Sequence, residues 1–159
     1  MKNFMSSLFF TLLFASIMLA ANGTPIFRTI RVGAGDRTIS LGEDLSKVED
    51  LLVKTEKGYK LKPHTFGGAK TINIYLSKAN RVRAIYFEYE ADKDFEKMVA
   101  SYTKGLGEPS TRQSFTSQAI QLEVDAWEDQ ETRFEIVKRV EQDNTFIFSA
   151  LFDKKVASK

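Results

Sequence analysis

The segment DKDFEKMVASYTKGLG, from Asp92 to Gly107, decides the fold class of this chain. Its apolar residues recur at helical spacing and form a single stripe, made of Phe95, Met98, Val99, Tyr102 and Leu106. Asp92 is placed to cap the start of a helix, Gly107 is placed to end it in a left-handed conformation, and Pro109 prevents its continuation. We therefore predict an amphipathic helix that buries one face against another layer.

Alternation of apolar and polar residues predicts strands on both sides of this helix. After it, the alternating segments are 120–127, 133–136 and 146–152; before it, they are 28–32, 38–41, 59–61, 72–76 and 81–89. Short polar links between them are typical of hairpin turns. The segment from Glu43 to Lys54 predicts a second helix, because four of its apolar residues share one helical face. These four residues are Leu45, Val48, Leu51 and Leu52. Ser40 and Glu43 at its start have the spacing of a capping box.

Each half of the chain then has one order, a helix followed by three antiparallel strands. This order predicts an α+β fold built as a tandem α-β-β-β repeat, in which an antiparallel sheet carries two helices packed on one face. We expect one domain over residues 24–159, and two half-repeats, 24–90 and 91–159, are the alternative division. The other face of the sheet would remain free.

The N-terminus has the layout of a secretory signal peptide over residues 1–23. Lys2 is followed by an uncharged run from Asn3 to Asn22 with a strongly apolar centre, and small residues allow cleavage after Ala21 or Gly23. We therefore expect an exported protein, either periplasmic or secreted. The alternative is an uncleaved membrane anchor, since about 20 uncharged residues can span a bilayer.

Composition excludes several chemistries. The 159 residues include no cysteine and a single histidine, His64, so disulfides, thiolate nucleophiles and multi-Cys/His zinc sites are excluded. The pair Gly33 and Gly35 lacks the rest of a nucleotide-binding motif and predicts a hairpin turn. We expect no cofactor and no metal. Pairs of carboxylates, such as Asp92 with Asp94, leave open a small secreted hydrolase that uses carboxylates, with or without His64.

Charge is unevenly distributed along a chain whose net charge is only +2. The segment 57–87 contains seven basic and no acidic residues, whereas the segment 123–143 contains eight acidic and three basic residues. The first segment predicts a basic surface for an anionic partner. Alternatively, the two segments face one another or are solvated, or they join neighbouring copies of a self-associating structural protein. Tyrosines in the basic segment, Tyr75 and Tyr86 among them, could stack on nucleic acid, but an exported protein meets little of it.

Six residues are candidates for binding. Arg81 and Arg83 are two residues apart, which would place both guanidinium groups on one face of a strand, and Lys62 and Lys70 flank the His64 loop. Trp127 is opposite in phase to the alternating apolar residues 120–126. It is therefore either an exposed contact anchor or part of a second core layer.

The order of these elements resembles a group of small exported bacterial proteins whose fold is similar to beta-lactamase inhibitory protein and to outer-membrane assembly lipoproteins of the SmpA/OmlA type. The resemblance rests on three segments: 39–42 leading into a short helix, 106–109 ending a helix, and 127–132 in a hairpin. It implies a non-catalytic protein that binds other proteins. Without cysteine, this chain lacks the lipid attachment residue of the lipoproteins. Our leading hypothesis is an exported binding or accessory protein that contacts another protein through an open sheet face and loops.

Overall fold

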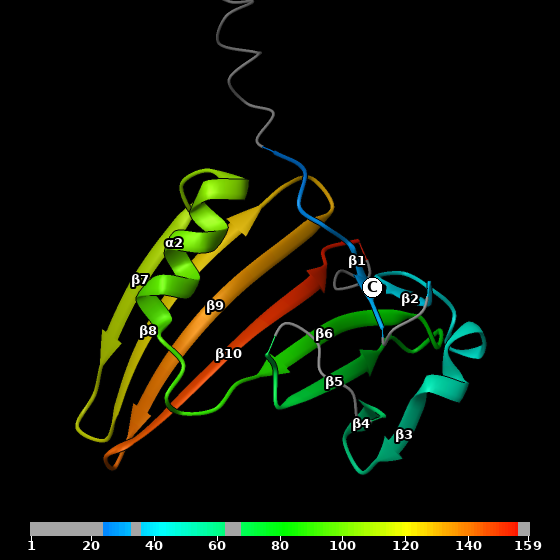
Figure 1. The fold of residues 1–159 in the computed structure, drawn as a ribbon, viewed down its shortest axis with the longest axis horizontal. Helices are drawn as coiled ribbons and strands as arrows, with labels where there is room; N and C mark the ends of the chain where they lie inside the picture. Colours follow the sequence, from blue (N-terminus) through cyan, green and yellow to red (C-terminus); the bar gives the residue numbers. More distant parts are fainter. Residues whose placement is uncertain (1–23, 33–35, 63–67, 156–159) are drawn as a thin grey trace, which may run out of the picture.

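An eight-stranded antiparallel sheet forms the body of the protein (Figure 1). The structure is a computed structural model, and it describes residues 24–32, 36–62 and 68–155. In spatial order the strands are β3 (Leu52–Thr55), β4 (Gly58–Leu61), β5 (Thr71–Leu76), β6 (Val82–Glu88), β10 (Asn144–Asp153), β9 (Thr132–Glu141), β8 (Ile120–Glu128) and β7 (Thr111–Thr116). Two meanders of consecutive strands, β3 to β6 and β7 to β10, are thus joined where β6 pairs with β10. The expected antiparallel, sheet-rich α+β class is confirmed.

The remaining elements lie on one face of this sheet, which we call the covered face (Figure 1). They are the helix α2 (Phe95–Leu106), a two-stranded sheet of β1 (Thr29–Arg31) and β2 (Thr38–Ser40), and two 3-10 turns, η1 (Leu45–Lys47) and η2 (Glu49–Leu51). A single apolar core lies between these elements and the sheet, and Ile39, Ile74, Ile85, Phe134 and Leu151 are fully buried in it.

The helix α2 matches the predicted apolar stripe. Three residues of this stripe, Phe95, Met98 and Val99, are buried against the sheet. Its N-cap is Asp94 rather than the expected Asp92, because the Asp94 carboxylate accepts the Lys97 backbone N–H at 3.0 Å. Gly107, at φ 83°, ends the helix as expected.

The expected helix over Glu43 to Lys54 is wrong. This segment forms η1, η2 and then β3. Its apolar spacing does reflect burial, because Val48 and Leu52 are buried and Leu45 and Leu51 pack against the core. A spacing of three residues also fits 3-10 turns, and the β-branched residues that follow pair with β4 instead of continuing a helix. The two predicted helices are therefore reduced to one α-helix in the part of the chain that the structure describes.

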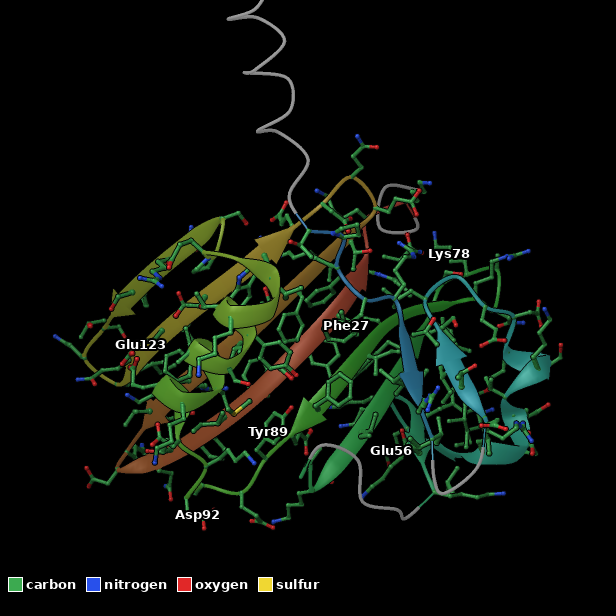
Figure 2. All side chains as sticks on the ribbon, turned by 45° about the horizontal axis from the view of Figure 1, so that its top comes forward. Phe27, Glu56, Lys78, Tyr89, Asp92 and Glu123 are labelled. Carbon is green, nitrogen blue, oxygen red and sulfur yellow. The ribbon has the colours of Figure 1, made fainter. Side chains whose placement is uncertain are left out.

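Partly buried polar contacts attach the segment before β1 to the end of the sheet where β8 ends, β9 begins and β10 ends. The Ile26 N–H donates to Asp129 Oδ2 at 2.8 Å, and Arg28 Nη2 donates to Asp153 Oδ2 at 2.5 Å. Arg28 also donates to the hydroxyl of Thr132 at 3.0 Å. Between these residues, Phe27 points toward the space between α2 and the sheet (Figure 2), where its ring packs 5.3 Å from that of Phe134. These contacts fix the N-terminal segment over the covered face.

Three predictions concern residues outside the described ranges: the signal peptide at residues 1–23, the glycine turn at 33–35 and the loop that contains His64. Among the helices that the structure does describe, none has the length and hydropathy needed to cross a membrane.

Candidate functional site: the open face of the sheet

The face opposite α2, which we call the open face, is covered by no described helix or strand (Figures 1 and 2). Strand register defines its side chains, because residues directly opposite each other on antiparallel strands share a face. One row across the open face consists of Asn73, Tyr86, Ala150, Glu135 and Ala126. The adjacent row lies on the covered face and consists of Ile74, Ile85, Leu151, Phe134 and Trp127.

A cluster of four aromatic rings occupies the centre of the open face. The ring of Tyr86 contacts that of Tyr75 edge-on at a centroid distance of 5.0 Å and that of Phe152 edge-on at 5.4 Å. The ring of Phe148 lies 6.4 Å from that of Tyr86 on the other side. All four residues are only partly buried. Burial is nevertheless the largest cause of a raised pKa of the Tyr86 hydroxyl, so the phenol stays neutral at physiological pH.

The apolar surface continues from this aromatic cluster toward the β7 edge. Ala150 and Ala126 are fully buried between larger neighbours and form a floor, and Leu122 and Val124 of β8 are partly exposed beside them. Two phenylalanines on this face are largely exposed, Phe146 at 51% and Phe115 at 61%. Large apolar residues at these exposures mark a surface that can bury further area on association.

A groove with a volume of about 770 Å³ opens at one end of the open face, where β6 ends and β10 begins. Phe146 and Phe148 contribute apolar walls, while Glu88 and Arg139 contribute charge. Asn73 donates to Glu88 at 2.8 Å, which holds that carboxylate beside the aromatic cluster. The groove thus combines an apolar wall with a few fixed polar groups, as binding sites commonly do.

Charged residues on the open face are paired with one another. Arg133 donates to Glu128 and, at 3.0 Å, to Glu135, and Arg139 donates to Glu141. Burial alone would lower the pKa of the Arg133 guanidinium, but the hydrogen bonds that it donates to Glu135 and Glu128, with the negative charges of these carboxylates, outweigh burial and raise it. A hydrogen bond from Lys154 is the largest cause of the lowered pKa of Glu128. The face therefore has an apolar centre with a neutralised polar rim, which is the usual composition of a protein–protein interface.

The predicted basic residues make separate contacts. Lys62 donates to the backbone carbonyl of Asp50, and Lys70 forms an ion pair with Glu90 at 3.2 Å. Arg81 precedes β6 and donates to the Gly42 carbonyl at 3.1 Å.

Arg83 lies within the register shift that interrupts the pairing of β5 with β6 after Tyr75. Its positive charge acts on Tyr86 of the open face. Because of this shift, a two-residue spacing does not by itself place Arg81 and Arg83 on one face. His64, the other residue assigned to this surface, is outside the described residues.

The acidic segment 123–143 is paired with bases close to it in the sheet. Glu123 pairs with Lys138 at 3.1 Å, and Asp125 pairs with Arg112 at 2.8 Å. Glu131 pairs with Lys155 and lies 3.6 Å from Arg28. These ion pairs neutralise much of the negative charge that the sequence indicates for residues 123–143.

Trp127 faces the core. Its phase relative to Val124 and Ala126 is as predicted, but the side of the sheet with Trp127 is the covered one, and the residue is 3% exposed. The indole Nε1–H donates to the Gly107 carbonyl at 2.8 Å, and the ring packs 5.7 Å from Phe134. Trp127 is thus a core residue and not an exposed anchor, but it belongs to the single core of the covered face rather than to a second layer.

Sequence reasoning did not identify Phe146, Phe148 and Phe152 as surface residues. A signal was present, because residues 146–152 are apolar at almost every position and not only at every second one. One face of a strand can hold only half of them, so such a run indicates apolar residues on both faces.

Within the described ranges, no group of three or more histidine, cysteine or acidic residues is placed to hold a metal ion. Comparisons with protein-family models, with curated proteins and with solved structures find no match to this chain.

Proposed function

We propose that this protein is a non-catalytic binding or accessory protein that contacts another protein through the open face of its sheet. The observation that carries this proposal is the aromatic cluster around Tyr86, which lies on a face that no described element covers. Tyrosine and other aromatic residues are enriched at the energetic centres of interfaces, where a partner excludes water from them.

The composition of the face supports a protein rather than a polyanion as the partner. Its arginines are already paired with Glu128, Glu135 and Glu141, so few free cations remain there to bind phosphate or sulfate groups. Its tyrosine and phenylalanine rings present rigid apolar area at little cost in conformational entropy. The groove beside Phe146 and Phe148 would accept an apolar side chain of the partner.

Site-specific photo-cross-linking in the cells that make the protein tests this proposal. A photoreactive phenylalanine analogue replaces Phe148, and the matched control carries the analogue at Lys104, which is exposed on α2. We expect a covalent adduct with another protein from position 148 and none from position 104. When Tyr86→Asp is combined with the analogue at position 148, the affinity for the partner should fall by at least about 30-fold, which is the scale of an interface hot spot. Equal adducts from both positions, or adducts unaffected by Tyr86→Asp in a folded variant, would refute the proposal.

We also propose that residues 1–23 direct export and are removed, which is consistent with a partner outside the cytoplasm. The mass of the protein recovered from the periplasm or medium should correspond to a start at Asn22 or Thr24. Full-length protein in the membrane fraction would contradict this.

We further propose that the two halves are a tandem repeat, as the order of their elements along the sequence predicts, in a fold similar to beta-lactamase inhibitory protein and the SmpA/OmlA-type lipoproteins. The meanders β3 to β6 and β7 to β10 have the same strand order, and each follows a helical segment, the 3-10 turns in one case and α2 in the other. The join between β6 and β10 makes both meanders contribute to one open face.

A further inference from the structure

A second surface adjoins the open face: the edge strand β7 (Thr111–Thr116), TRQSFT. It pairs with β8 along one side and with no described strand along the other. Of its six residues, five are exposed, including Phe115. An exposed edge strand offers a row of unpaired backbone donors and acceptors to another strand.

The hairpin geometry identifies which backbone groups are free. The Ser117 N–H donates to the Ile120 carbonyl at 2.8 Å at the turn between β7 and β8. Hydrogen-bonded and non-hydrogen-bonded pairs alternate along an antiparallel ladder, so Phe115, Gln113 and Thr111 also exchange hydrogen bonds with β8. The N–H and C=O groups of the intervening residues, Arg112, Ser114 and Thr116, therefore point away from β8 along the free edge, in the plane of the sheet.

The usual means of protecting an edge are absent from β7. Natural edge strands are blocked by lysine, proline, bulges or short length. The other edge strand of this sheet, β3, has four residues and contains Lys54. In contrast, β7 has six residues in unbroken register, and its only charged residue is Arg112. Arg112 is neutralised by Asp125 at 2.8 Å and Glu108 at 3.1 Å.

We propose that β7 pairs antiparallel with β7 of a second copy of this chain, about a two-fold axis at Ser114. In this register Ser114 lies opposite Ser114 of the second copy, and Arg112 lies opposite Thr116. All three outward-pointing residues of each copy then form hydrogen-bonded pairs, with about six backbone hydrogen bonds in total. No charged residue lies opposite a like charge.

The side chains of the edge also suit this pairing. A two-fold axis normal to the sheet keeps the open faces of both copies on the same side. Phe115, at 61% exposure, would pack across Gln113 of the second copy on that side. On the covered side, Arg112, Ser114 and Thr116 are exposed, so α2 does not cover this edge and leaves space for the second sheet.

Sedimentation of the wild type and two Ser114 variants over a range of protein concentration tests the pairing. We expect a reversible dimer for the wild type and for Ser114→Thr, which keeps the backbone N–H. Ser114→Pro removes the N–H that points outward, so the fold should tolerate it as edge strands tolerate proline. It should weaken dimerisation by roughly 30-fold or more, because both hydrogen bonds at the axis are lost. A wild type that is monomeric at all concentrations, or a dimer unaffected by Ser114→Pro, would overturn the proposal.

A single-cysteine experiment tests the register without relying on proline. The chain has no native cysteine, so Ser114→Cys introduces one thiol, and Ser101→Cys on the exposed side of α2 is the matched control. Residues opposite each other across an antiparallel pair are about 5.5 Å apart at Cα, which a disulfide can bridge. Mild oxidation should give a disulfide-linked dimer rapidly from Ser114→Cys and slowly from Ser101→Cys. Equal rates from both variants would overturn the register.

Discussion

Replacing Asp153 with alanine should strongly destabilise the protein, because it removes a buried carboxylate that fixes the N-terminal segment to the sheet. The Asp153 side chain is 3% exposed and accepts Arg28 Nη2 at 2.5 Å. It also accepts the Lys155 backbone N–H at 2.9 Å. Asp153→Ala removes both acceptors and leaves the Arg28 guanidinium, 28% exposed, with only its weaker neighbours.

The size of the effect follows from burial. Removing one partner of a fully buried ion pair costs about 3–5 kcal/mol. This pair should lie at the lower end, because Arg28 is 28% exposed and retains contacts with Thr132 and Glu131. We therefore expect a loss of about 3 kcal/mol in the free energy of unfolding. For a domain of this size this corresponds to a fall in Tm of roughly 10 °C.

The pair Arg37–Asp50 provides a matched control on the surface. It has the same chemistry at 2.8 Å, but its side chains are 51% and 64% exposed. Asp50→Ala should leave Tm close to that of the wild type, since exposed pairs contribute little. Thermal unfolding followed by circular dichroism measures both variants. A fall in Tm no larger for Asp153→Ala than for Asp50→Ala would refute the argument from burial.

Four further predictions concern single residues. Trp127 emission should be blue-shifted and resist acrylamide quenching, because the indole is 3% exposed; red-shifted, quenchable emission would contradict its place in the core. Burial raises the pKa of Tyr102 from the ordinary tyrosine value of about 10 to about 12, so the free energy of unfolding should fall as pH rises from about 10 to 12. Tyr102→Phe should reduce that dependence on pH in urea titrations. Gly105→Ala should raise Tm, because alanine reduces the conformational entropy of the unfolded chain and nothing lies within 4 Å of the added Cβ. The free energy of unfolding should rise by about 0.5–1 kcal/mol. Gly58→Ala should lower Tm, since its Cβ would lie 2.8 Å from the Ile74 carbonyl oxygen; the same sign for both glycines would refute this.

Local patterns predict those elements whose two sides differ in environment. The helix α2 buries Phe95, Met98 and Val99 on one side and exposes the other, so its periodicity is clear. The strand β7 was not predicted, because an edge strand with exposed side chains on both faces has no alternation to detect. The helix expected over Glu43 to Lys54 was wrong because apolar residues three apart fit a 3-10 turn as well as an α-helix.

The open face could not be located from one strand. Residues 120–126 alternate as a core-facing strand does, yet Leu122 and Val124 are on the open face, and Trp127 is on the covered one. Both phases of β8 contain apolar residues, and only the positions of α2 and β1 decide which phase is covered. That decision depends on packing between segments far apart in the sequence, which a local pattern does not contain.

The join between β6 and β10 has a consequence for how the chain reaches its native state. β10, the last of the described strands in sequence order, lies in the middle of the sheet, between β6 and β9. Until it is in place, β6 and β9 each keep an unpaired edge, and contacts between distant segments of this kind form slowly. A chain interrupted before Asn144 would therefore expose two apolar strand edges at once and be prone to aggregation. The topology thus makes native folding depend on synthesis of the chain through Asp153.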